Sequence, residues 1–290
     1  MTLHHSVKSG MVFRDEGRGT PILLIHGWGV SGALFDAQFE ALADRHRVIA
    51  PDLRGHGDSD PFTASMPFAH LADDIALLMG ELDLDRACVV GWSMGAMVAW
   101  DLLLRYPGLN VAGLITLDMV PQLLNGPEWQ HGLRDGEDIR VFNRQIRQMR
   151  EDWPGFAEWF VPRMFAERPD GPDKAVLQQA LEIALANDNE SLALIWTRMA
   201  EQDFRASLAS IEQPTLIIAG ARSQLYGVRA GQWIATSMPN ARLEIFSESG
   251  HAPHIEEPQR FNKLLSEFAG SLHRNPDRTA EQPAETGPAS

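Results

Sequence analysis

The sequence contains a single cysteine, Cys88, among its 290 residues. One cysteine cannot form a disulfide framework within the chain, and it cannot supply a cysteine-based metal site. Cys88 lies in an apolar, β-branched run, so we expect it to be a buried core thiol. The chain also lacks the ligand spacing of a metal site and the glycine-rich spacing of a phosphate-binding loop. We therefore expect a protein that needs no metal, nucleotide or other cofactor.

Positive charge is scarce, since 25 lysines and arginines stand against 39 aspartates and glutamates and the formal net charge is -14. Nucleic acids and anionic membrane surfaces attract basic proteins, so neither is an expected partner. No apolar run approaches the ~20 residues that cross a bilayer. The N-terminus lacks the apolar segment of a signal peptide. We expect a cytoplasmic protein with a small-molecule partner, and the sequence does not indicate an oligomeric state.

What the chain does have is an alternation of two kinds of segment. With 290 residues, 44% of them hydrophobic, it can bury one large core. Strand-like runs at residues 21–25, 47–51 and 87–91 are separated by helical patterns at 33–43 and 68–82. Such alternation predicts an α/β fold, in which a mostly parallel sheet is covered by helices on both faces.

A serine stands at the most distinctive turn of the sequence. Residues 91–95 read Gly-Trp-Ser-Met-Gly, and they join the apolar run 87–90 to a helix-like run at 96–104. Strand, Gly-x-Ser-x-Gly and helix in this order predict a nucleophile elbow, a sharp turn that exposes the hydroxyl of Ser93 at a helix N-terminus. The two glycines would leave room where a Cβ atom collides. The alternative is an ordinary tight turn between a strand and a helix.

Acyl transfer by a serine needs backbone N–H groups that stabilise the oxyanion. Residues 26–29 read His-Gly-Trp-Gly and directly follow a predicted strand. We expect the N–H of Trp28 in this loop to be one donor and the N–H of Met94, after the serine, to be the other. Trp28 and Trp92 flank the centre in the sequence, so we predict that both bind the substrate.

Four histidines are candidates for the general base. Residues 242–246 alternate between polar and apolar as a strand does, and His251 follows in a loop, behind a glycine that lets the chain swing it over the sheet. His251 is therefore the predicted base, with His254 as its competitor three residues on. His26 and His56 stand in glycine-rich turns, and we interpret both as structural.

Together these motifs resemble the α/β-hydrolase family of serine hydrolases over residues ~10–270. The resemblance rests on residues 26–29, 52–59, 91–95 and 249–251. It implies the α/β-hydrolase fold and a catalytic triad in the chain order serine, acid, histidine. The pair of motifs at 26–29 and 91–95 is similar to those of carboxylesterases that cleave pimeloyl-carrier-protein methyl esters, which adds a carrier-linked ester to the candidate substrates.

The acid of the triad is missing from the loop after the seventh strand, where the family usually carries it. That strand is predicted at 214–220, and Ser223 stands where an aspartate is expected. Asp118 ends the predicted sixth strand at 111–117, and haloalkane-dehalogenase-like members of the family carry their acid there. We predict that Asp118 is the acid. A turn-forming role of Asp118, or Glu248 as the acid, are the alternatives.

Residues 121–210 contain helical patterns and no convincing strand. The expected helices lie near 141–149, 156–167, 174–186 and 191–199. An insertion between strands six and seven predicts a helical cap over the ligand-binding end of the sheet, with residues 1–120 and 211–273 as the hydrolase core. The large apolar side chains of this insertion either pack it together or line an acyl pocket. Residues 274–290 are rich in proline, glutamate and alanine and are predicted to be disordered.

The predicted function is hydrolysis of a carboxylic ester with a small to medium acyl chain, through an acyl-enzyme intermediate on Ser93. A serine at the elbow excludes the alkyl-ester intermediate of dehalogenases and epoxide hydrolases, which use an aspartate there. Thioester hydrolysis, carbon–carbon bond cleavage and acyl transfer would use the same triad. A ligand sensor that keeps the hydrolase fold is the non-enzymatic alternative.

Overall fold

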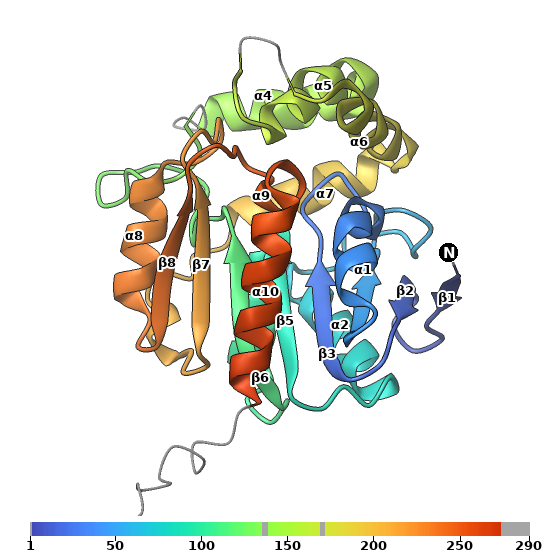
Figure 1. Cartoon of the computed structure of the whole chain (residues 1–290). Helices are drawn as coiled ribbons and strands as arrows, with labels where there is room; N and C mark the ends of the chain where they lie inside the picture. Colours follow the sequence, from blue (N-terminus) through green and yellow to red (C-terminus); the bar gives the residue numbers. More distant parts are fainter. Residues whose placement is uncertain (1, 135–138, 169–171, 274–290) are drawn as a thin grey trace, which may run out of the picture.

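An eight-stranded sheet forms the centre of the computed structural model, which describes residues 2–134, 139–168 and 172–273 (Figure 1). The strands lie in the order β1-β2-β4-β3-β5-β6-β7-β8. All pairs from β4 to β8 are parallel, whereas β1 and β2 are antiparallel at one edge. Their bounds are β1 (Leu3–His5), β2 (Val12–Glu16), β3 (Thr20–Ile25), β4 (His46–Pro51), β5 (Ala87–Trp92), β6 (Val111–Leu117), β7 (Thr215–Gly220) and β8 (Ala241–Phe246). The prediction of a mostly parallel α/β sheet is confirmed.

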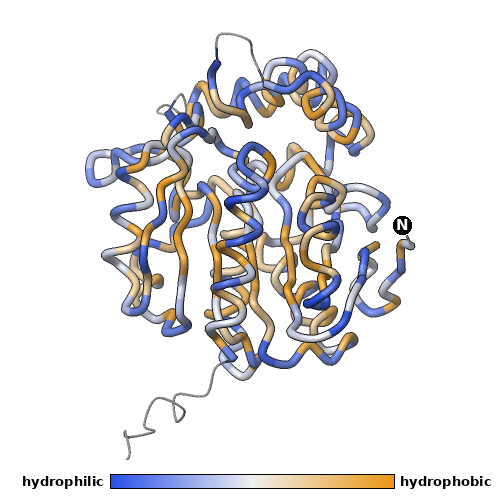
Figure 2. The backbone as a smooth tube through the Cα atoms, viewed as in Figure 1, coloured by the Kyte–Doolittle hydropathy of each residue, from blue (hydrophilic) through white to orange (hydrophobic). Residues whose placement is uncertain are grey.

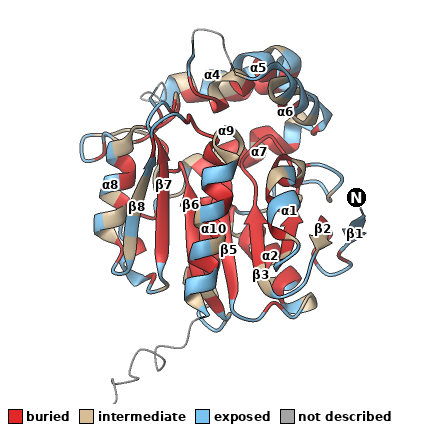
Figure 3. Cartoon of the chain, in the orientation of Figure 1, coloured by how far each residue is buried: buried red, intermediate tan, exposed pale blue. Residues whose placement is uncertain are grey.

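Central strands are the ones that the sequence identifies best. Every residue of β5 and of β7 is buried, because helices cover both faces of the sheet, and their sequences are correspondingly continuous apolar runs. Figures 2 and 3 show the same pattern, since hydrophobic and buried residues coincide along the middle of the sheet. The edge strands β1 and β2 are not predicted by the sequence analysis. The first has three residues, all of them exposed, so it carries no hydrophobic signal.

Helices lie on both faces of this sheet. On one face α1 (Asp36–Leu42) contacts α10 (Pro258–Leu272), and on the other α2 (Ala69–Glu81) contacts α3 (Met94–Arg105) (Figure 1). Helix α8 (Val228–Ser237) packs on β7 and β8. Short helices are also formed by η1 (Gly32–Phe35) and α9 (Pro253–Glu256) in the core and by η3 (Leu208–Ser210) at the end of the insertion, before β7.

In the described residues between β6 and β7, four α-helices form a separate layer at the top of Figure 1, beyond the ends of the strands. We call them the α4–α7 layer. Its members are α4 (Ile139–Glu151), α5 (Trp153–Phe160), α6 (Lys174–Ala186) and α7 (Asn189–Ala200). Helix α6 matches its predicted bounds, while α4 and α7 are one or two residues longer at each end. The stretch predicted at 156–167 is divided, because α5 gives way to a 3-10 turn η2 (Val161–Met164) that contains Pro162, which has no N–H to donate.

Cys88 lies fully buried in β5, and burial raises the pKa of its thiol to about 12. A thiol with so high a pKa stays protonated and unreactive, which confirms the prediction of a core cysteine. The tail predicted to be disordered, residues 274–290, lies outside the described residues.

Candidate active site

Ser93 occupies a sharp turn between β5 and α3. Its backbone has φ +54° and ψ −123°, a region that residues other than glycine rarely adopt. A Cβ atom on Gly91 would lie 2.4 Å from the carbonyl oxygen of Gly95, and one on Gly95 would lie 2.2 Å from that of Ile25. Both glycines are therefore required by the close approach of α3 to β5 and β3. The flanking glycines have the steric role that the sequence predicts.

The predicted oxyanion donors, Trp28 and Met94, lie in the loop after β3 and at the start of α3. Within the described residues, the N–H groups of Trp28 and Met94 donate no hydrogen bond to the protein. Met94 is the first residue of α3, so the positive end of the helix dipole adds to its N–H. A Cβ atom on Gly27 would lie 3.1 Å from the Cβ atom of Ser93, so the loop that carries Trp28 runs directly beside the serine.

Two buried histidines hold this loop. The Nε2 atom of His26 accepts a 2.8 Å hydrogen bond from the N–H of Leu53, and that of His56 accepts a 3.0 Å bond from the N–H of Gly29. Burial lowers the pKa of His26 to about 4. Burial, together with the neighbouring His26, lowers the pKa of His56 well below its ordinary value. Neutral rings that accept from backbone N–H groups agree with the structural roles that we assign to both histidines from the sequence.

His251 and Asp118 come together although 133 positions separate them in the chain. The Nδ1 atom of His251, in the loop after β8, lies 2.8 Å from Oδ2 of Asp118, which directly follows β6. Both side chains are almost completely buried. The N–H of Ser93 donates a 2.9 Å hydrogen bond to the carbonyl of Leu117, so the serine and the aspartate stand at adjoining strand ends. This geometry can hold an imidazole in one orientation beside a serine.

Ser223 supports this carboxylate. Its hydroxyl donates a 2.6 Å hydrogen bond to Oδ2 of Asp118, and the N–H of Gly220 donates a 3.2 Å bond to Oδ1. In the sequence, Ser223 is recognisable only as the residue at an empty acid position. A small hydroxyl side chain at that position, next to an aspartate at the end of the neighbouring strand, is the signal that could have revealed the contact.

The alternative base, His254, and the alternative acid, Glu248, have other partners. His254 is fully buried and packs against Trp92, with 4.5 Å between ring centroids, and burial lowers its pKa to about 3. Glu248 forms a 2.5 Å ion pair with Arg222, and both side chains are well exposed. Among the described contacts, neither side chain bonds to the ring of His251. The geometry therefore favours the pair of His251 and Asp118.

The structure gives Trp92 a contact that the sequence does not predict. The Nε1 atom of Trp92 donates a 2.7 Å hydrogen bond to the carbonyl of His251, and the two rings lie 5.8 Å apart. Its side chain is almost fully buried and supports the histidine loop from within the core. Tyr226 packs edge-on to the same imidazole, with 5.5 Å between centroids. These two aromatic rings restrict the movement of His251.

Trp28 is enclosed by aromatic residues of the α4–α7 layer. Its ring centroid lies 4.7 Å from that of Trp196 and 5.2 Å from that of Phe160. Beyond these rings lies a small pocket that opens to solvent. Its walls are mainly apolar, with two arginines and two glutamines, and consist of Leu133, Arg134, Gln145, Phe156, Trp159, Phe160, Arg163, Trp196, Gln224 and Leu225. Phe160 and Trp196 therefore separate the pocket from Trp28.

Two kinds of feature are absent from the described part of the chain. No group of three or more histidine, cysteine, aspartate or glutamate side chains is placed to hold a metal ion there. In the same residues, no helix has the length and apolar character needed to cross a membrane.

Residues 22–264 match the sequence model of the alpha/beta hydrolase family. The AB hydrolase superfamily protein YisY of Bacillus subtilis is 29% identical over 260 residues, which cover 89% of this chain and 94% of that protein. The pimeloyl-[acyl-carrier protein] methyl ester esterase of Aromatoleum aromaticum is 32% identical over 255 residues, which cover 85% of this chain and 96% of that protein.

Solved structures of esterases are also similar to this chain. The malate-bound esterase from Thermogutta terrifontis is 29% identical, with a TM-score of 0.80 over 91% of this chain and 94% of that one. The esterase RhEst1 from Rhodococcus sp. ECU1013 is 26% identical, with a TM-score of 0.80 over 94% of this chain and 100% of that one.

Proposed function

The chain belongs to the alpha/beta hydrolase family, and from this we propose that it hydrolyses carboxylic esters through an acyl-enzyme on Ser93. The observation that carries the proposal is the 2.8 Å contact between His251 and Asp118 beside the elbow that bears Ser93. The names of its relatives, which are esterases, support the choice of ester over other acyl substrates.

The proposed mechanism has two steps. Asp118 holds the proton on Nδ1 of His251, so that Nε2 is the basic nitrogen and takes the proton of the Ser93 hydroxyl as the serine attacks the ester carbonyl. The N–H groups of Trp28 and Met94 stabilise the oxyanion of the tetrahedral intermediate. His251 then protonates the leaving alcohol, and a water activated by the same histidine releases the acid.

The α4–α7 layer is the proposed cap of this site. It lies at the ends of the strands where Ser93 and Asp118 stand, which is where open α/β sheets bind ligands (Figure 1). We assign the apolar pocket behind Phe160 and Trp196 to the acyl chain of the substrate, with Trp28 between this pocket and the serine. In this arrangement, rotation of the aromatic rings admits the substrate to Ser93.

A methyl ester on a carrier-linked acyl chain is a second candidate substrate. The Aromatoleum aromaticum relative, which matches 85% of this chain, is named for that activity. Hydrolysis of methyl esters of free acids and of the same acids linked to a carrier protein separates the candidates, since a carrier enzyme should prefer the linked form strongly.

The first test measures hydrolysis of p-nitrophenyl esters from acetate to laurate, with the Ser93→Ala variant as the control. Turnover by the wild type that falls at least about 10³-fold in the variant is the expected result. The preferred chain length then gives the size of the acyl pocket. Tight binding of an ester without turnover, by a folded wild type, would reject the enzyme in favour of the ligand sensor.

A further inference from the structure

One residue of the α4–α7 layer bonds to two loops of the core. Asn187 directly follows α6, and its side chain is buried. Its Nδ2 donates a 3.1 Å hydrogen bond to the carbonyl of Gly29, and its Oδ1 accepts a 2.8 Å bond from the N–H of Gly57. A third bond, from Nδ2 to the carbonyl of Ile183 in α6, fixes the amide plane. Because both ends of the amide are used, its orientation is set by the contacts themselves.

The loop that Asn187 holds is the one that carries Trp28. Gly29, with φ +74°, follows Trp28 directly, and its N–H bonds to His56. The indole Nε1 of Trp28 donates a 2.9 Å hydrogen bond to the carbonyl of Leu192 in α7. The backbone at Trp28 is thus fixed on one side by a core histidine and on the other by two contacts with the α4–α7 layer.

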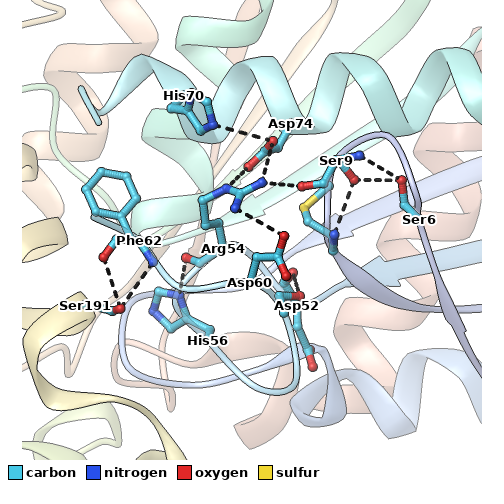
Figure 4. A network of polar contacts seen from close by, with 12 residues as sticks. Ser6, Ser9, Asp52, Arg54, His56, Asp60, Phe62, His70, Asp74 and Ser191 are labelled. Atoms are coloured by element: carbon cyan, nitrogen blue, oxygen red, sulfur yellow. Dashed lines mark hydrogen bonds and ion pairs between the residues drawn. The ribbon is translucent and has the colours of Figure 1, made fainter. Parts of the chain in front are cut away.

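A further contact joins the layer to the second loop, which carries Gly57 and spans residues 52–68 between β4 and α2. Figure 4 shows Ser191 of α7 between the N–H and the carbonyl of Phe62, both at 3.2 Å from its hydroxyl oxygen. The same loop is held from the core side, because Arg54 forms a 2.7 Å ion pair with the buried Asp74 of α2. The second loop is therefore a rigid support, and Asn187 links it to the first.

We propose that Asn187 is a positioning residue for the oxyanion hole, which becomes complete only when the α4–α7 layer is docked on the core. This proposal rests on the proposed function, because it concerns the donor that Trp28 supplies. An oxyanion donor acts only if its N–H lies within hydrogen-bond distance of the developing charge. Loss of the Gly29 contact removes one of the bonds that hold the segment 27–30, so the Trp28 N–H is aimed less precisely; transition-state stabilisation then falls while ground-state binding of the ester is unchanged.

The test compares Asn187→Ala and Asn187→Asp with a matched control, Asn189→Ala. Asn189 begins α7 two residues later, and its side-chain bonds among the described residues stay within the layer, to the carbonyls of Met149 and Arg150 at 3.3 and 3.2 Å. An aspartate at 187 keeps the acceptor for the Gly57 N–H and loses the donor to the Gly29 carbonyl. It therefore separates the bond to Gly57 from the two bonds that Nδ2 donates, to the carbonyls of Gly29 and Ile183.

Both Asn187 variants should lower kcat by roughly tenfold to hundredfold with KM within about twofold, since the Trp28 N–H then stabilises the oxyanion less strongly. Their affinity for an alkylboronic acid, whose adduct with a serine places an oxygen in the hole, should fall in parallel. Asn189→Ala should stay close to wild type. A higher KM with unchanged kcat, or equal losses in all three variants, would show that Asn187 serves substrate binding or the layer as a whole.

A second readout does not depend on turnover. Hydrogen–deuterium exchange of the segment 26–30, which contains the Gly29 N–H, should be faster in both Asn187 variants than in the wild type and unchanged in Asn189→Ala. If the wild type hydrolyses no ester, the proposed function fails, and this exchange measurement still decides whether Asn187 holds the loop. Unchanged exchange in a folded Asn187→Asp would overturn the inference.

Discussion

Ser93 and Asp118 have left-handed backbones, with φ of +54° and +43°, at the ends of neighbouring strands. Such conformations cost roughly 1–3 kcal/mol each and persist only where the surroundings enforce them. Here each N–H is bonded to the next strand, Ser93 to Leu117 and Asp118 to Ile218. Because these strained residues stand at rigid strand ends, their side chains are held in position more precisely than a loop would hold them.

At the same scale, the roles of Asp118 and Ser223 can be separated. Asp118→Asn should lower kcat by roughly 10³–10⁴-fold, because an amide neither stabilises an imidazolium nor favours the right tautomer of His251. Ser223→Ala removes one neutral donor to the carboxylate and should cost about tenfold or less. Steady-state kinetics, with thermal melts to verify folding, measure both.

Moving the carboxylate gives the stricter test. The double variant Asp118→Asn with Ser223→Asp puts the acid on the other strand end, within reach of the same histidine, and should regain at least about tenfold over Asp118→Asn alone. Near wild-type kcat in Asp118→Asn would remove Asp118 from the triad.

At the scale of elements, the sequence predicts well those helices whose ends carry clear capping residues. Helix α6 is found to the residue, because Asp173 caps its N-terminus by accepting from the N–H groups of Ala175 and Val176, and Asn187 ends it. The exposed edge strand β1 is missed, since only its pairing with β2 makes it a strand. A strand that forms only by pairing with its neighbour shows little hydrophobic pattern in its own sequence.

Two helical glycines should respond in opposite ways to alanine. Gly95→Ala in α3 places a Cβ atom 2.2 Å from a backbone oxygen of β3, and should destabilise the fold by about 3 kcal/mol or more. Gly80→Ala in α2 meets nothing within 4 Å and should stabilise by roughly 0.5–1 kcal/mol. Urea denaturation measures both free energies of unfolding. Equal effects would contradict the close packing of α3 on β3.

At the scale of the whole molecule, sequence reasoning places Ser93, Asp118 and His251 together because the carboxyl ends of parallel strands share one edge of a sheet. It does not find the contacts that cross between the layer and the core. The bond from Trp28 to Leu192 joins residues 164 positions apart, and the one from Asn187 to Gly29 spans 158. A backbone carbonyl accepts from any side chain, so these bonds impose no pattern on the sequence.

The stability of the whole molecule should depend on the buried ring of His254. Within the described residues, neither ring nitrogen has a hydrogen-bond partner, and burial lowers the pKa to about 3. The unfolded chain binds a proton near pH 6.5 and the folded chain does not. Stability is therefore full above pH 6.5 and is lost as the pH falls from there towards 3, by roughly 1.4 kcal/mol per pH unit.

His254→Phe should remove this loss, because a phenyl ring suits the surrounding Trp92, Phe35 and Phe261 and cannot be protonated. Free energies of unfolding at pH 8 and pH 5 measure the effect: the variant should gain on the wild type by about 2 kcal/mol between the two. A parallel decline of both proteins would assign the acid sensitivity to other groups.

The aromatic cluster at Trp28 also has a photophysical consequence. Three of the eight tryptophans meet there, with Trp28 on the core and Trp153 and Trp196 on the α4–α7 layer, at centroid distances of 5.8 and 4.7 Å. Indoles so close together exchange excitation energy and quench one another. Separation of the layer from the core would end this coupling and hydrate all three rings. The native ultraviolet emission of the unlabelled chain is thus a built-in optical signal for that movement, which stopped-flow mixing with substrate can follow in real time.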